Sequence, residues 1–286
     1  MNLGYACINT ALSANKIMTN RTMRRKTFDA KGIDYVSDLA LLNVKDLKTI
    51  VQWNNEMGIK LFRLSSQIFA WSDEYKLSDL KDYDEICSMM LEIGKIATNA
   101  NQRLTMHPGP YNCLASPNQK VVEKTIRELN CHSEQFNMLG FKPSNYNKIN
   151  IHVGGAYGDK KGTLERFCKN FELLNDDTKK RLVIENDDSP NEYSVKDLFD
   201  GIYQTIGIPI TFDYFHHKFN TGGLTEEEAL KMAAITWPEG IAQCCHYSES
   251  RRKEKLDESI RPQAHSDIIY EKIQTYGLEP DIVIEA

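Results

Sequence analysis

The stretch RLVIEND, residues 181–187, is a short apolar run that leads into the carboxylate Glu185. Similar runs recur at RLTMH (103–107), INIHV (149–153), ITFD (210–213) and DIVIE (281–285), and each has a histidine or an acidic residue at or near its end. Amphipathic helical sequence separates the runs, and this alternation is typical of βα units around a parallel sheet. The pattern therefore predicts an α/β protein in which polar side chains follow the strands.

We predict eight strands, at Leu3–Asn9, Ile59–Leu64, Arg103–Met106, Lys148–Val153, Arg181–Glu185, Ile210–Asp213, Ile241–His246 and Asp281–Glu285. Helical patterns lie between them at Val44–Met57, Asp84–Asn101, Gln119–Leu139, Leu164–Leu174, Ser194–Ile206, Glu226–Ala234 and Ile268–Tyr276. Eight strands with seven helices predict a (β/α)₈ TIM barrel that lacks its last helix, with residues 1–286 in a single domain. A doubly wound open sheet is the alternative, but no GxGxxG motif follows the first strand.

The composition is that of a globular chain with a sizeable core, since 26% of the residues are charged and 41% are hydrophobic. No apolar run is long enough to cross a bilayer, and the first residues, MNLGYACINT, lack the features of a secretory leader. The seven cysteines show no CxxC spacing, so we expect reduced thiols. These features predict an intracellular monomer without membrane contact.

The formal net charge of −5 argues against nucleic-acid binding through bulk positive charge. A nucleic-acid partner would need local basic clusters, and two exist, within residues 21–26 and 251–255. A run of charges taken alone is more often a solvated surface.

Six of the predicted strands end in residues that bind metals or transfer protons. These are His107, His152, Glu185, Asp213, His246 and Glu285, while His216 and His265 follow in the loops after the sixth and seventh strands. In a TIM barrel the carboxyl ends of the strands form the active site. One such histidine alone is more often structural, but the whole set indicates a cluster of divalent metals, because imidazole and carboxylate suit Zn²⁺, Mn²⁺ or Fe²⁺. A central carboxylate that bridges two ions is typical of hydrolases, and the ions would make the cleft attractive to phosphates.

Ten segments of the chain, in their order and spacing, resemble the UV damage endonucleases, a family of metal-dependent DNA repair nucleases with a (β/α)₈ fold. The segments are LGYACIN, NRTMR, FRLSS, MHPGPY, IHVGGAYGDK, IEND, FDYFHH, HYSES, AHSD and VIEA. The resemblance runs from the first strand to the last. It implies a double-stranded DNA substrate that carries UV lesions.

The resemblance also implies how the metal ligands are grouped. His107, His152 and Glu185 would form the first site. Glu185, as the bridge, would form the second with Asp213, His246 and Glu285, and a third would use His216 and His265. Two or three divalent ions are implied, with Mn²⁺ the expected occupant and Zn²⁺, Co²⁺ or Mg²⁺ as alternatives. Incision immediately 5′ to cyclobutane dimers or 6-4 photoproducts is implied, leaving a 3′-hydroxyl and a 5′-phosphate.

At several positions the chain departs from the family pattern. Cys244 stands where relatives have a modified lysine, and Gln263 stands where apurinic endonucleases have an aspartate, so the third metal site has two obvious ligands. Gln67 replaces a histidine of some relatives. The HPG turn usually continues with glutamine and an aromatic residue, but here Pro110 precedes Tyr111. Proline removes a polar side chain and a backbone donor and stiffens the turn, so lesion preference is expected to differ.

Several other residues are candidates for contacts with DNA. Tyr111 would fill the gap that a poorly stacked lesion leaves when it is extruded, and Tyr5 and Asn9 would line that space. Arg63, Arg21, Arg24, Arg25 and Lys160 are candidates for phosphate contacts, which fix register without reading sequence. We place Lys160 with Glu185 among the candidate catalytic residues.

Three alternatives remain open at the level of sequence. An apurinic-site endonuclease or a sugar isomerase would use the same metal-bearing barrel. A damage-binding protein that no longer cuts would be a different class, although such a protein does not need a bridging carboxylate.

Overall fold

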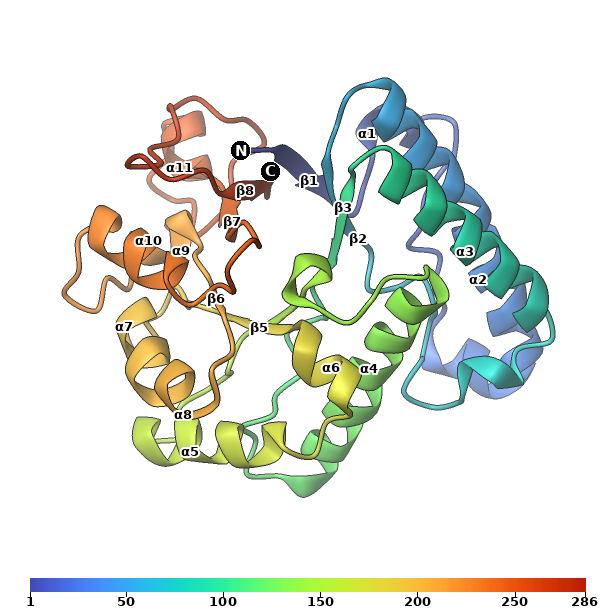
Figure 1. Cartoon of the computed structure of the whole chain (residues 1–286), viewed down its shortest axis with the longest axis horizontal. Helices are drawn as coiled ribbons and strands as arrows, with labels where there is room; N and C mark the ends of the chain where they lie inside the picture. The colour runs from blue at the N-terminus through green and yellow to red at the C-terminus, as the bar shows by residue number, and fades with distance from the viewer.

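Eight parallel strands form the barrel that the sequence predicts (Figure 1). The computed structural model describes all 286 residues. The strands are β1 (Leu3–Ala6), β2 (Leu61–Leu64), β3 (Arg103–Met106), β4 (Ile149–Ile151), β5 (Leu182–Glu185), β6 (Ile210–Thr211), β7 (Cys244–Tyr247) and β8 (Asp281–Ile284). Their order is β6-β5-β4-β3-β2-β1-β8-β7, and a parallel bridge between Asp213 and His246 joins the two ends of this order. The sheet therefore closes on itself.

Helices surround the barrel between successive strands (Figure 1). They are α1 (Thr10–Ser13), α2 (Arg25–Glu56), α3 (Tyr83–Asn99), α4 (Gln119–Met138), α5 (Lys160–Phe171), α6 (Asp176–Arg181), α7 (Val195–Leu198), α8 (Gln204–Ile206), α9 (Tyr214–His217), α10 (Glu226–Ala234) and α11 (Arg251–Lys255). Short 3₁₀ turns lie at Leu77–Asp79 and Asn145–Asn147, and a π-helical turn, Phe199–Tyr203, joins α7 to α8. None of these helices has the length and apolarity that a bilayer span requires.

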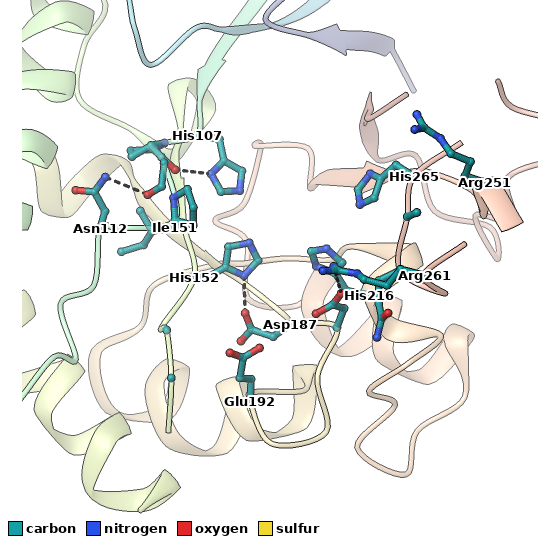
Figure 2. Close-up of a pocket in the computed structure, with 18 residues that line it drawn as sticks. His107, Asn112, Ile151, His152, Asp187, Glu192, His216, Arg251, Arg261 and His265 are labelled. Atoms are coloured by element: carbon teal, nitrogen blue, oxygen red, sulfur yellow. Dashed lines mark hydrogen bonds and ion pairs between the residues drawn. The ribbon is translucent and has the colours of Figure 1, made fainter. Parts of the chain in front are cut away.

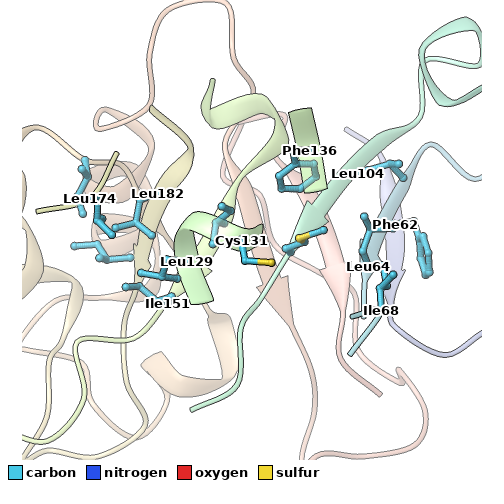
Figure 3. Packing of buried hydrophobic residues seen from close by; sticks show 14 of the residues in the cluster. Phe62, Leu64, Ile68, Leu104, Leu129, Cys131, Phe136, Ile151, Leu174 and Leu182 are labelled. Atoms are coloured by element: carbon cyan, nitrogen blue, oxygen red, sulfur yellow. The ribbon is translucent and has the colours of Figure 1, made fainter. Parts of the chain in front are cut away.

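The main core lies between the strands and the outer helices. In α4, Val122, Leu129 and Phe136 are buried at intervals of seven residues, so they line one face of the helix. Figure 3 shows Leu129 and Phe136 in the same cluster as Phe62 and Leu104, which come from β2 and β3. The helical pattern read from the sequence is therefore the face that packs on the barrel.

Side chains alternate between this core and the interior of the barrel, because successive residues of a strand point to opposite sides. An inner cluster consists of Leu61, Val183, Cys244 and Val283 from four strands, with Trp237 beside them. A buried ion pair between Arg103 and Asp281, 3.1 Å apart, lies at the amino ends of β3 and β8. Every second residue toward the carboxyl ends is consequently an inward-facing position, and the polar strand ends occupy these positions.

The predicted helix at Ile268–Tyr276 is wrong, because this segment is irregular. The buried carboxylate of Glu249 accepts hydrogen bonds from the backbone amides of Tyr270 (3.2 Å) and Glu271 (2.8 Å), which removes them from a helical pattern. The predicted strand Leu3–Asn9 is also too long. It ends at Ala6 because Cys7 has a φ of 59° and Asn9 caps the short helix α1.

The helix predicted at Val44–Met57 begins much earlier, at Arg25, with a break at Gly32, where φ is 66°. The other predicted strands and helices are present with bounds shifted by a few residues. Between β7 and β8 the chain forms only the short helix α11, and no helix follows β8.

Substitution of Gly94 in α3 tests how closely the outer helices pack. A Cβ atom at this position would lie 1.7 Å from the carbonyl oxygen of Leu139, at the end of α4. We expect Gly94→Ala to lower the free energy of unfolding by about 1–3 kcal/mol, although alanine ordinarily favours a helix over glycine. Chemical denaturation of the metal-free protein measures this. Gly109→Ala, which meets no atom within 4 Å, is the control, and equal stability of both variants would contradict the proposed clash.

Candidate metal centre at the carboxyl ends of the strands

The candidate ligands converge on Glu185, the last residue of β5. Its Oε2 lies 3.1 Å from Nε2 of His107 and 3.7 Å from Nε2 of His152. Its Oε1 lies 2.9 Å from Nδ1 of His246 and 3.7 Å from Nδ1 of His216. The ligand atoms form two groups within 4.8 Å, namely His107, His152 and Glu185, and Glu185, Asp213 and His246. Glu185 belongs to both, which is the geometry that a bridging carboxylate needs.

Four histidines are fixed through Nδ1 by an oxygen of the protein. Nδ1 lies 3.0 Å from the carbonyl of Pro108 in His107, 2.7 Å from Asp187 in His152, 2.8 Å from the carbonyl of Asn186 in His216 and 3.2 Å from the carbonyl of Glu285 in His265. A ring that donates its Nδ1 proton keeps the Nε2 lone pair for a ligand, and such partners typically orient metal-binding histidines. The arrangement therefore fits a metal centre better than isolated structural histidines.

His246 is turned the other way. Its Nδ1 faces Glu185 and Glu285, at 2.9 and 3.1 Å, while its Nε2 lies 3.0 Å from Nζ of the buried Lys148. Burial lowers the pKa of His246 to about 4, so the ring is neutral near pH 7. Neutral imidazole is the form that binds metals.

The carboxylates of Asp213 and Glu185 have very different environments. Burial raises the pKa of Asp213 to about 7. Burial opposes ionisation of Glu185 as well, but His246 and His152 outweigh it and hold the pKa of Glu185 well below its usual range. Oδ2 of Asp213 is buried without a hydrogen-bond partner, which is costly for a polar atom unless something else binds there. This orphan oxygen, in a donor set of imidazoles and carboxylates, fits a divalent cation.

An open cavity of about 660 Å³ lies beside the centre (Figure 2). His107, His152, His216 and His265 all contribute to its wall. The predicted third pair is less complete than the other groups: the rings of His216 and His265 are 6.3 Å apart, and neither belongs to the two close groups. Gln263 lines the cavity beside them, whereas Cys244 is buried in the inner cluster.

The HPG turn stands at the rim of this cavity. Pro110 lines it, and the side chain of Tyr111 is 89% exposed. A large aromatic residue that is so exposed has no packing role in the free protein, and its contact to DNA stays a prediction. Tyr5 and Asn9 lie instead at a separate hollow of about 300 Å³, where Asn9 donates to the Tyr5 hydroxyl at 2.8 Å.

The arginines near the start of α2 are mostly engaged with acidic residues. Arg21 lies 2.6 Å from Asp46. Arg25 lies 2.8 Å from Asp29 and 2.6 Å from Glu74. Arg24, directly before the helix, is exposed.

Two further predicted phosphate contacts are also occupied by carboxylates. Arg63 donates to Glu285 and so holds a candidate metal ligand. The ammonium of Lys160 lies 3.4 Å from Asp197 and lines a neighbouring hollow, and the structure does not bring it into contact with Glu185. The catalytic role of Lys160 stays a prediction.

Sequence reasoning missed three residues that hold the ligands in place. Asp187 contacts His152, Asn150 donates to Oε2 of Glu185, and Lys148 contacts His246. A signal was present, because Asn150 lies two residues before His152 and Asp187 two residues after Glu185. With a period of two, these positions share a face with the ligands.

Asp187 is the partner whose removal should weaken the metal centre without loss of the fold. Asp187→Asn keeps the size of the side chain but replaces the charged acceptor of His152. We expect metal affinity to fall about 10–100-fold, the usual effect of losing such a partner. Competition with a fluorescent chelator measures the affinity, and circular dichroism checks the fold. Unchanged affinity would show that Asp187 does not act through His152.

Comparisons with known proteins find relatives both by sequence and by fold. The family model described as "UV-endonuclease UvdE" matches residues 1–286. The chain is 38% identical over 280 residues to a UV-damage endonuclease of Schizosaccharomyces pombe, covering 94% of this chain but 46% of the relative. It is 34% identical over 284 residues to a putative UV-damage endonuclease of Acanthamoeba polyphaga mimivirus, covering 98% of this chain and 83% of that protein.

The crystal structure of SacUVDE superimposes with a TM-score of 0.85 at 30% identity, covering 100% of this chain and 92% of that one. The match includes the strands that carry the candidate ligands. The chain spans less than half of the fission yeast relative, so the two differ in overall extent. By sequence and by fold, the chain belongs to the UV-endonuclease UvdE family.

Proposed function

We propose that the chain is a metal-dependent endonuclease that incises double-stranded DNA at UV lesions. One observation carries the proposal: both oxygens of Glu185 are shared between histidines, of which His107 lines an open cavity, and the exposed Tyr111 directly follows Pro110 of the cavity wall. A bridged pair of ions suits phosphodiester hydrolysis, and an exposed aromatic ring suits the recognition of a disturbed base stack.

Two or three divalent ions, Mn²⁺ as the expected occupant, would be held by the residues already described. His107, His152 and Glu185 would form the first site, and Glu185, Asp213, His246 and Glu285 the second. His216 and His265 would form a third, weaker site. When bound, the ions would neutralise the charge of the phosphodiester and lower the pKa of a bound water toward neutrality.

The protein's own side chains would keep these ligands ready. Asn150 holds one oxygen of Glu185, and Arg63 holds Glu285, while burial lowers the pKa of His246 and keeps its ring neutral. Because these contacts exist before DNA arrives, little reorganisation would be needed when the substrate binds.

Lesion recognition would fall to the turn after β3. A damaged dinucleotide stacks poorly, so extruding it costs less than extruding intact bases, and this difference favours the lesion. Tyr111 would fill the gap, while Pro110 limits the conformations of the turn. In finer detail, we propose incision immediately 5′ to cyclobutane dimers and 6-4 photoproducts, with a 3′-hydroxyl and a 5′-phosphate as products.

Glu185→Gln should abolish cutting because an amide cannot bridge two cations as a carboxylate does. We expect nicking of UV-irradiated plasmid with added Mn²⁺ to fall by about two orders of magnitude or more, since losing even an outer partner of a ligand costs 10–100-fold. Unirradiated plasmid and EDTA are the controls. Wild-type nicking by a folded Glu185→Gln protein would refute the proposal, and abasic DNA tested in parallel separates apurinic-site cleavage.

Tyr111→Ala should mainly affect the choice between damaged and intact DNA. Since Tyr111 is exposed, the unfolding free energy should change by less than about 0.5 kcal/mol. The ratio of incision rates on photoproduct and intact duplexes should fall about tenfold, the scale of one lost base stack. Tyr111→Phe, which keeps the ring, is the matched control. If the alanine variant keeps the full ratio, Tyr111 is not the residue that fills the gap at the lesion.

A further inference from the structure

Most of the basic side chains expected to contact phosphate are already paired in the structure. Arg21 is bound to Asp46, Arg25 to Asp29 and Glu74, and Arg63 to Glu285. Using them for DNA would require breaking these ion pairs. Arg24 has no ion pair but does not line the cavity, so the side chain that meets a phosphodiester in the cavity should come from another part of the chain.

Helix α11 and the loop that follows it supply two arginines to the cavity wall, Arg251 and Arg261. Arg251 is held by Asp267, 2.6 Å away. The side chain of Arg261 makes no hydrogen bond, and its one ion pair, to Asp188, is long at 3.8 Å. It is also 75% exposed. Of the two arginines in the cavity wall, Arg261 is thus the one with the weaker ion pair to the protein.

Arg261 also stands in the right place. Figure 2 shows it on the side of the cavity formed by His216 and His265, opposite His107 and Asn112 of the HPG turn. A DNA strand that crosses the cavity with its lesion at the turn would therefore run from Tyr111 past the metal ligands to Arg261.

The backbone around Arg261 is held by hydrogen bonds, although its side chain makes none. Arg252 donates to the carbonyl of Ile260 at 2.7 Å, and the amide of Ala264 donates to the carbonyl of Arg261 at 3.0 Å. A second backbone bond joins Arg251 to Ala264 at 2.9 Å. Because the loop is already ordered, only the side chain of Arg261 would lose freedom on binding, which lowers the cost of a contact.

We propose that Arg261 binds the phosphate backbone of the DNA strand beside the metal centre and exchanges its loose contact with Asp188 for a forked contact to phosphate oxygens. A guanidinium matches phosphate through two parallel N–H donors, which a carboxylate at 3.8 Å does not exploit. This inference rests on the proposed function, since it takes DNA as the substrate. Arg261 is then the residue that holds the DNA strand on the side of the cavity away from Tyr111.

Binding without cutting tests this role. The protein is kept in EDTA, and fluorescence anisotropy follows its binding to a labelled duplex with one photoproduct over a range of salt concentrations. Arg261→Gln should weaken binding about tenfold and reduce the salt slope by about 1, as expected for one lost phosphate contact. Arg261→Lys should keep most of the slope but regain only part of the affinity, since it has the charge without the fork.

Lys142→Gln is the matched control, because it removes the same charge from the far end of the barrel, beside Gln102 and Asn147. It should leave affinity and slope nearly unchanged. If wild-type protein binds and cuts damaged DNA while Arg261→Gln keeps the wild-type affinity and slope, the inference is overturned and the proposed function stands. If wild-type protein neither binds nor cuts the duplex, the proposed function fails with it.

The exchange with Asp188 has its own test. Asp188→Asn should strengthen DNA binding in the wild-type background and do so less in the Arg261→Gln background, because the two residues act on each other. Glu192→Gln removes a charge from the same cavity wall, and Glu192 makes no ion pair with Arg261, so its effect should differ less between the two backgrounds than the effect of Asp188→Asn. Equal effects of Asp188→Asn in both backgrounds would mean simple repulsion of DNA and would overturn the exchange.

Discussion

A buried carboxylate has to be compensated, and in this barrel that carboxylate is Glu185. It is 1% exposed, yet it stays charged because histidines at the carboxyl ends of β3, β4 and β7 surround it and Asn150 donates to it. Each of these residues occupies an inward position at a strand end. Many of the inward side chains at the carboxyl ends of the strands are thus arranged around one negative charge, which suits the metal ions that we propose.

The sequence predicts most of this layer because strand alternation is a local property. Once a run such as RLTMH is taken as a strand, the inward position of His107 follows from a period of two. The failed helix at Ile268–Tyr276 shows the limit of such reasoning. Its sequence has a helical pattern, but the distant Glu249 binds two of its amides, and no local pattern reports that partner.

The same limit applies to the basic residues. Arg21 and Arg25 are identifiable as a cluster from sequence, but their acidic partners depend on how the chain folds back, with Asp46 and Glu74 far along it. The cavity arginine Arg261 stands alone in the sequence and gives no cluster signal. The availability of a cation for a substrate therefore depends on tertiary structure. The direction in which a strand histidine points depends almost entirely on secondary structure.

The bridge between Asp213 and His246 has a wider consequence. β6 and β7 are the two ends of the strand order, and this bridge, with one hydrogen bond from the amide of His246 to Phe212 at 3.0 Å, joins them. The barrel is therefore closed between β6 and β7 by two of the candidate ligands. An ion bound by both residues would link β6 to β7 where few backbone hydrogen bonds do. Separation of these two strands and release of the ion would then be the same event.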